Sequence, residues 1–533
     1  MTLLLASAIL LSAKGKPNII VIVANDLGYS DLGVYGSEIN THNLDLLAEE
    51  GVIFKEFYNT SVGNPSKAAI LTGRYPHQAG VGYFFGGLGV KGYEGHLNIQ
   101  SLTIGEVLRH AGYTTLHAGE WGVAADGKGY PLERGFDHSF LSESGGSYFD
   151  QKEVSYTLDS KPFSIADGSY YLTDLITDQA IRFVKEARQG KKPFFLYLSY
   201  TAPHWPLHAP ADDVNRYRGK FDTGYQTLRE KRLSALQKSG IIDSCFKLPK
   251  KEDDVYIWKR VAYNMKHLLV KRQEVYAAQI DRLDQNIGRL RQLLQDEGVD
   301  NNTVVIFLSD NGAPSEDIVR WHRGAIRNQA TVGTAGSFES IGKEWAYLSN
   351  SPLRGYKDQL YEGGISSPLI VWGAPGQQRG AIVKGIGHVI DIAPTVYAIA
   401  GASYPKKYQG QVTGALEGVS LLPVITGRAD TVSRTAPLFW EHAGNRAVRR
   451  GDWKIVNHYP NYEWSLYNIS NDRGETNDLA SKHPKLLQTL ATEYYEWAQQ
   501  NNIEDFNTLK PLEPDTLFQL RRSRHKNFRT NNR

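Results

Sequence analysis

The sequence predicts an α/β protein with a doubly wound, mostly parallel β-sheet and a small C-terminal α+β subdomain. Unbroken apolar runs of strand length occur at residues 17–24, 193–200 and 303–309, and such runs are typical of strands that are buried on both faces. Residues 275–294 have the spacing of an amphipathic helix. Strands that alternate with helices in this way favour parallel connections within one sheet.

The other expected elements continue this alternation. Helices that stop at a glycine are expected at residues 43–51 and 104–113. We interpret the polar residues 313–350 as a long active-site loop, and the charged residues 216–271 as an excursion over the core. Further predicted elements are strands at 52–57, 114–118, 368–372, 447–450 and 453–456, and helices at 174–186 and 486–499.

Four parts are expected along the chain: an export signal at 1–15, the α/β unit at 16–430, the α+β subdomain at 431–520 and a basic tail at 521–533. The first part is apolar and ends in small side chains, as a secretory signal does, but no basic segment precedes it. A buried first strand is the alternative. The tail carries six basic residues and no acid, which fits either a solvated tail or an arm that binds an anionic polymer.

The composition is typical of a globular protein with a large core. The chain has 533 residues, of which 41% are hydrophobic, and a formal net charge of only +3, which gives no support for a nucleic-acid partner. No later segment has the roughly 18 successive apolar residues that a membrane span needs. The single cysteine, Cys245, excludes an intrachain disulfide, and we expect it to be a packing residue.

Polar side chains follow four of the predicted strands. In open α/β sheets, ligands collect at the carboxyl ends of the strands, so a carboxylate at such an end is better placed for metal binding than for packing. Only a shared crevice would bring together groups that are so far apart in sequence. These groups are Asn25 with Asp26, Glu120, His204, and Asp310 with Asn311.

Residues 62–74 form a predicted tight loop that leads into a helix. Pro65 fixes the backbone and Ser66 can cap the helix, so that the N–H groups of its first turn face an anion. The segment resembles the signature of the sulfatase family, in which a Cys or Ser, a variable residue, Pro, a small residue and Arg precede Thr-Gly-Arg. In that family the Cys or Ser is oxidised to formylglycine, whose hydrate attacks the sulfur of a sulfate ester. Here Gly63 occupies the nucleophile position and Lys67 the Arg position, so formylglycine cannot form at Gly63.

The resemblance extends from residue 16 to about residue 480 and is greatest to the arylsulfatase branch. The matching segments include residues 75–82, 276–284 and 466–469. The resemblance implies the α/β sandwich fold of the alkaline phosphatase superfamily. It also implies a calcium ion held by two pairs of residues, which here read Asn25-Asp26 and Asp310-Asn311. Since Asn25 replaces a carboxylate, we expect weaker calcium binding. The alternative is that Asp26 and Asp310 are only loop carboxylates.

The resemblance also implies a set of cationic and polar groups around the sulfate. Three of these positions differ from the family: Lys67 lacks the two-pronged guanidinium, Gly122 lacks an imidazole, and Glu120 replaces a lysine. A carboxylate about 4 Å from a sulfate oxygen would repel it by a few kcal/mol, and we expect Glu120 to pair with Lys67 or Lys357. Taken singly, His204 could be a loop residue and Lys357 a surface cation. The complete set is Gly63, Lys67, Glu120, Gly122, His204 and Lys357.

Two functions remain open from the sequence. The first is a catalytically impaired sulfatase homologue that binds a sulfated small molecule, a sulfated carbohydrate or a metal. The second is an active sulfuric ester hydrolase with an atypical nucleophile or a metal-activated water. Thr60, Ser61 and Ser66 are the candidate replacement hydroxyls, and each would need an activating base or metal within about 3 Å.

Overall fold

The structure is a computed structural model that describes residues 15–125, 127–143, 147–150, 154–165, 170–253, 255–318 and 330–509. The predicted export signal, except Gly15, and the predicted basic tail lie outside these residues. Among the helices that are described, none has the length and apolar character of a membrane span.

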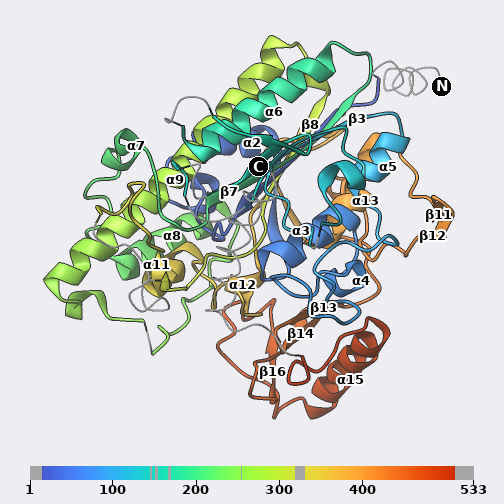
Figure 1. The fold of residues 1–533 in the computed structure, drawn as a ribbon. Coiled ribbons are helices and arrows are strands. Elements are labelled where there is room, and N and C mark those ends of the chain that lie inside the picture. The colour runs from blue at the N-terminus through green and yellow to red at the C-terminus, as the bar shows by residue number, and fades with distance from the viewer. Residues whose placement is uncertain are drawn as a thin grey trace, which may run out of the picture.

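A ten-stranded sheet forms the centre of the molecule, and its middle is parallel (Figure 1). The strand order is β10-β2-β9-β8-β1-β7-β3-β4-β5-β6. The four strands β8, β1, β7 and β3 are neighbours and run parallel, whereas β9 pairs antiparallel with both β2 and β8. The strands are β1 (Asn18–Asn25), β2 (Val52–Tyr58), β3 (Thr114–Gly119), β4 (His138–Ser142), β5 (Tyr156–Leu158), β6 (Lys161–Phe163), β7 (Phe194–Pro203), β8 (Thr303–Ser309), β9 (Leu369–Trp372) and β10 (Ala381–His388).

Helices cover both faces of this sheet. All eight residues of β1 are buried, and they alternate between the two layers: Ile20 and Ile22 pack into one core, Val21 and Val23 into the other. The first core lies under α2 (His42–Glu50), α6 (Leu172–Arg188) and α9 (Tyr263–Asp296), and the second under α3 (Gly63–Thr72), α5 (Ile104–His110) and α13 (Ile392–Ala400). The shorter or peripheral helices are α4 (Pro76–Ala79), α7 (Ala211–Asn215), α8 (Tyr225–Ser239), α11 (Gly342–Ser349), α12 (Glu362–Ile365) and α14 (Leu422–Ile425).

A second, antiparallel sheet forms the C-terminal subdomain, which is orange to red in Figure 1. Its strands follow chain order, and one helix packs against them; the elements are β13 (Leu438–His442), β14 (Asn445–Arg450), β15 (Trp453–Asn457), β16 (Trp464–Asn468) and α15 (Pro484–Gln500). A two-stranded ribbon precedes the subdomain, formed by β11 (Lys407–Tyr408) and β12 (Gln411–Val412). Apolar residues of the subdomain belong to the same core as α3 and α13.

The structure confirms the predicted fold class and corrects four local expectations. Ser66 does not cap α3, because the helix already begins at Gly63 and the Ser66 hydroxyl bonds to Thr60 instead. The ten-stranded sheet contains β4, β5, β6 and β10, which the sequence analysis did not predict. Cys245 is exposed, so its expected packing role is wrong. The two long polar regions contain helices, namely α8 and the start of α9 in the first and α11 in the second.

Candidate active site

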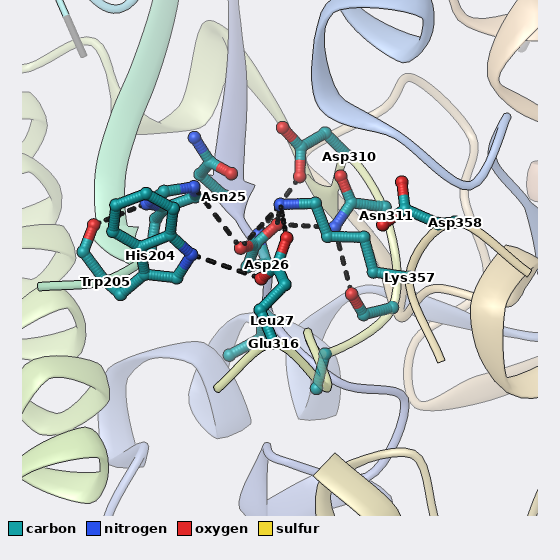
Figure 2. A network of polar contacts seen from close by, with 12 residues as sticks. Asn25, Asp26, Leu27, His204, Trp205, Asp310, Asn311, Glu316, Lys357 and Asp358 are labelled. Carbon is teal, nitrogen blue, oxygen red and sulfur yellow. Dashed lines mark hydrogen bonds and ion pairs between the residues drawn. The ribbon is translucent and has the colours of Figure 1, made fainter. Parts of the chain in front are cut away.

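The carboxyl ends of four adjacent parallel strands meet at one edge of the sheet, and the predicted site residues follow them. Asp310 and Asn311 follow β8, Asn25 and Asp26 end β1 or follow it directly, His204 follows β7, and Glu120 follows β3. Lys357 enters from the loop between α11 and α12. Figure 2 shows Lys357, His204 and Asn311 converging on Asp26.

Asp26 is the centre of this polar network. Its φ of 68° places it in the left-handed region, which Asp tolerates better than most residues. The Asp26 N–H donates to Asp310 Oδ1 at 3.1 Å, and Asn311 Nδ2 donates to Asp26 Oδ1 at 2.6 Å. Lys357 Nζ lies 3.0 Å from the Asp26 carboxylate, and His204 Nε2 lies 3.6 Å from it.

A second charged cluster lies beside the first. Lys67 Nζ is 3.0 Å from Glu120 Oε2 and 3.1 Å from Asp310 Oδ2, and all three side chains are buried. Asn25 Nδ2 donates to the same Glu120 oxygen at 2.7 Å. The expected pairing of Glu120 with Lys67 is therefore present, whereas Lys357 pairs with Asp26.

Gly63 is the first residue of α3, directly after the extended Val62. A Cβ atom built on Gly63 would lie 2.9 Å from Asp310 Oδ2, 3.5 Å from Lys67 Nζ and 3.7 Å from Asn311 Oδ1. A side chain at this position would thus start among the polar groups of both clusters. Glycine leaves that place without a reactive atom.

Gly122 has a φ of 72°, and the space beside it is filled. A Cβ atom on Gly122 would lie 2.3 Å from Asn64 Oδ1 and 3.4 Å from Lys67 Cδ. Asn64 is held there, because its Nδ2 donates to the Phe84 carbonyl at 2.7 Å. An imidazole at residue 122 would therefore be strained by the left-handed backbone and would require Asn64 to move.

Comparison with known proteins identifies the family. The Sulfatase family profile matches residues 17–402, which is most of the chain. The chain belongs to the sulfatase family. An arylsulfatase of Klebsiella aerogenes is 33% identical over 440 residues, covering 79% of this chain and 94% of that protein. An uncharacterized sulfatase of Schizosaccharomyces pombe is 33% identical over 514 residues, covering 89% of this chain and 92% of that protein.

Solved structures show the same sulfatase fold. The crystal structure of Ps i-CgsB in complex with k-i-k-neocarrahexaose has a TM-score of 0.69 and 24% identity, covering 95% of this chain and 98% of that chain. A protein solved with its substrate D-glucosamine-2-N,6-O-disulfate has a TM-score of 0.62 and 23% identity, covering 92% of this chain and 99% of that chain. At these identities the likeness concerns the fold.

The charges of this sulfatase site follow from burial and pairing. Burial disfavours the charged form of Lys67, but Glu120 and Asp310 outweigh it and hold the Lys67 pKa above its ordinary value. Burial would raise the Asp26 pKa, but the charge of Lys357 and the hydrogen bond from Asn311 oppose it, and that pKa lies below the usual range. Burial lowers the pKa of His204 to about 4. At neutral pH both lysines are therefore cations, and His204 is neutral.

Sulfatases generally bind a metal ion, and the oxygen atoms of this site fit a hard cation such as Ca²⁺. Asn311 Oδ1 is buried without a hydrogen-bond partner in the described part of the chain. Asp310 Oδ2 is held in an ion pair with Lys67 at 3.1 Å, and both oxygens face the position of a Gly63 side chain. Asp26 adds a second carboxylate. Within the same residues, no group of three or more His, Cys, Asp or Glu side chains is arranged to hold a metal, so the fit depends on amide oxygens.

Several contacting residues were not singled out from the sequence. Glu316 lies 3.6 Å from Lys357 and accepts from Trp205 Nε1 at 3.1 Å, and burial raises its pKa to about 7. The one feature of the sequence that pointed to Glu316 was its position within the predicted polar loop at 313–350. Asn64 had a stronger signal, because it lies inside the recognised segment at 62–74, next to Gly63.

Proposed function

We propose that this sulfatase-family chain binds a sulfated ligand and does not hydrolyse it. The observation that carries the proposal is Gly63, which begins α3 where a nucleophile would stand and supplies no oxygen or sulfur. In the first turn of α3, Pro65 has no N–H and the Ser66 N–H donates to the Val62 carbonyl at 3.0 Å, so the N–H groups of Gly63 and Asn64 are the ones left for an anion. Binding and turnover are therefore separable at this position.

The charge balance also supports the absence of turnover. Both lysines that would face a sulfate are neutralised inside the protein, Lys67 by Glu120 and Lys357 by Asp26. Asp26 and Glu120 balance the two ammonium groups. Burial raises the Asp310 pKa, and once ionised Asp310 adds a third negative charge. A negative pocket repels a sulfate, so an anionic ligand gains from a bound cation.

Calcium binding is part of the proposal. Asp26, Asp310 and Asn311 would hold the ion, and Asn25 would contribute at most a neutral oxygen. A bound Ca²⁺ adds two positive charges beside Gly63 and so favours an anionic ligand. Because Asn25 has no charge, we expect weaker affinity than in a site with three carboxylates.

An active sulfuric ester hydrolase is the second candidate. Ser61 favours it, because its Oγ is buried and has no hydrogen-bond partner among the described residues. Ser66 is less suitable, since its hydroxyl is engaged with the Thr60 hydroxyl at 2.8 Å. No activating base contacts Ser61 Oγ in the part of the chain that the structure describes, so the first candidate is preferred.

Two measurements on the purified protein separate the candidates. Calorimetry with sulfated mono- and disaccharides and with 4-nitrophenyl sulfate, with and without Ca²⁺, measures binding. Ion chromatography of the same mixtures measures released sulfate. We expect saturable binding without release. Release that is lost in Ser61→Ala but retained in Ser66→Ala would support the hydrolase.

Export completes the proposal, since residues 3–13 have the apolar character of a secretory signal. Expression of the full chain, followed by N-terminal sequencing of protein from the exported fraction, tests it. Cleavage close to residue 15 is the expected result. Intact protein confined to the cell interior would contradict it.

A further inference from the structure

Three tyrosine rings and one arginine form an exposed patch on the C-terminal subdomain, here named the tyrosine patch. Tyr459 and Tyr462 lie in the turn between β15 and β16, with 37% and 45% of their surface exposed. Tyr495 of α15 is 51% exposed. Arg446 of β14 joins them, since its guanidinium lies 5.2 Å from the Tyr462 ring and 5.9 Å from the Tyr495 ring. Large exposed aromatic side chains that cluster in this way mark binding surfaces.

The rings of the patch are held in fixed orientations. Tyr459 OH donates to Asn507 Oδ1 at 3.0 Å, and Asn507 Nδ2 donates to Tyr462 OH. The Tyr459 ring also meets Phe506 edge-on at 5.3 Å. Because these contacts already order the side chains, a ligand that stacks on them loses little affinity to conformational entropy.

Arg446 supplies a positive charge without a carboxylate partner. Across the residues that the structure describes, it makes no ion pair, and its side-chain hydrogen bond goes to Tyr495 OH at 3.5 Å. A guanidinium held by aromatic rings retains its planar donors for a sulfate or carboxylate. The patch thus combines apolar faces with a site for one anion.

The patch is connected to the candidate active site through the subdomain. Asp358, next to Lys357, lies 3.6 Å from His442 Nε2 at the end of β13. Asn445 begins β14 after the short turn that follows His442, and its Oδ1 accepts from the Tyr459 N–H at 3.1 Å. A chain of contacts therefore leads from Asp358, the neighbour of Lys357, to the patch.

We propose that the tyrosine patch binds the sugar rings of a sulfated polysaccharide while another unit of that chain occupies the candidate active site. This inference rests on the proposed function and extends it from a single sulfated group to a polymer. The C–H faces of sugar rings carry partial positive charge and match the negative faces of aromatic rings. A protein partner is less favoured, because Tyr459, Tyr462, Tyr495 and Arg446 include no aliphatic side chain. The polar groups beside them are the amides of Asn445 and Asn507 and the Asp505 carboxylate, which accepts from Asn507 at 3.0 Å.

The test uses size-defined oligosaccharides of two sulfated polymers, heparin and carrageenan, in di-, tetra- and hexasaccharide lengths. We expect the hexasaccharide of at least one polymer to bind about ten times more tightly than its disaccharide. In Tyr462→Ala, loss of a stacking ring should weaken hexasaccharide binding by about three- to tenfold and leave the disaccharide unchanged. Arg446→Lys should keep part of the increase in affinity from disaccharide to hexasaccharide, because lysine retains the positive charge but lacks the planar guanidinium donors.

Tyr263→Ala is the matched control, since Tyr263 is 78% exposed but lies on α9; it should bind as the parent does. The inference is overturned if the protein binds all oligosaccharide lengths with equal affinity, or if Tyr462→Ala binds the hexasaccharide as the parent does. In either case, binding of the disaccharide would still support the proposed function. Absence of binding at every length overturns both. A change of oligomeric state in Tyr462→Ala, measured by sedimentation, would instead make the patch a self-interface and would also overturn the inference.

Discussion

The carboxylate of Glu120 lies 3.0 Å from the ammonium of Lys67, and both side chains are buried. An ion pair removed from water is strong only if its remaining atoms are satisfied. Here Asn25 binds one Glu120 oxygen, but Glu120 Oε1 has no hydrogen-bond partner among the described residues. The pair thus uses a cation that could otherwise face a sulfate, at a position where the family resemblance implies a lysine.

Glu120→Gln should strengthen the binding of sulfated ligands. The amide keeps the shape of Glu120 and can still accept from Asn25, but it leaves Lys67 with one carboxylate partner, Asp310, in place of two and removes a repulsive charge. We expect roughly tenfold tighter binding, about 1–2 kcal/mol, at low salt. Calorimetry with a sulfated disaccharide measures it. Glu50→Gln, which breaks a pair with Arg291 elsewhere, is the control, and unchanged affinity in Glu120→Gln would contradict the account.

Gly122→His should destabilise the protein rather than repair the site. Residue 122 has a left-handed φ of 72°, and a Cβ there would meet Asn64 Oδ1 at 2.3 Å. Strain of this kind costs about 1–3 kcal/mol before the clash is counted. Urea unfolding measures the loss. The comparison variant is Gly63→Cys. Residue 63 lies outside the left-handed region, and the shortest contact of a Cβ there is 2.9 Å, to the end of the Asp310 side chain. Equal stability of the two variants would refute the prediction.

Calcium should stabilise the protein through Asp310. At a concentration ten times the dissociation constant, binding to the native state alone adds about 1.4 kcal/mol to the free energy of unfolding. Thermal melts with increasing CaCl₂ measure this shift, and Asp310→Asn should abolish it. Asp358→Asn, whose side chain pairs with His442 instead, should retain it. An identical shift in Asp310→Asn would place the ion elsewhere.

Stability should fall as the pH drops from 6.5 towards 4, in part because of His117. Burial lowers the pKa of His117 to about 4, so its ring is neutral in the fold and binds Ser139 Oγ and the Glu120 carbonyl. The unfolded chain, with an ordinary histidine pKa near 6.5, binds the proton first, so that protonation favours unfolding within this window. In His117→Gln, the slope of unfolding free energy against pH should decrease by up to about 1.4 kcal/mol per pH unit. An unchanged slope would show that His117 is charged in the fold.

The sequence predicted the central strands because their environment is uniform. The strands β1, β7 and β8 are buried throughout, so apolar runs marked them directly. Among the missed strands, β10 lies at the sheet edge, and its residues change irregularly between buried and partly exposed, with Lys384 exposed. The helix α8 was hidden for another reason: its charged residue Arg232 is buried, where it pairs with Asp31 at 2.9 Å and Glu38 at 2.8 Å.

The candidate site could be anticipated because parallel strands bring their carboxyl ends to one edge. That rule, with the family resemblance, placed Asp26, Asp310, His204 and Glu120 together. It could not identify Glu316 or the steric role of Asn64, because these depend on where a loop folds back and on the space beside Gly122. Tertiary contacts of this kind leave no pattern in the local sequence.

Release of inorganic sulfate by the unaltered protein tests the account most directly. Protein at a concentration equal to that of 4-nitrophenyl sulfate or a sulfated disaccharide, with Ca²⁺ present, would be followed by ion chromatography over hours. The account predicts sulfate release no faster than in buffer, because Gly63 has no side chain to attack sulfur. Sustained release by the parent chain that disappears in Asp310→Asn would contradict it.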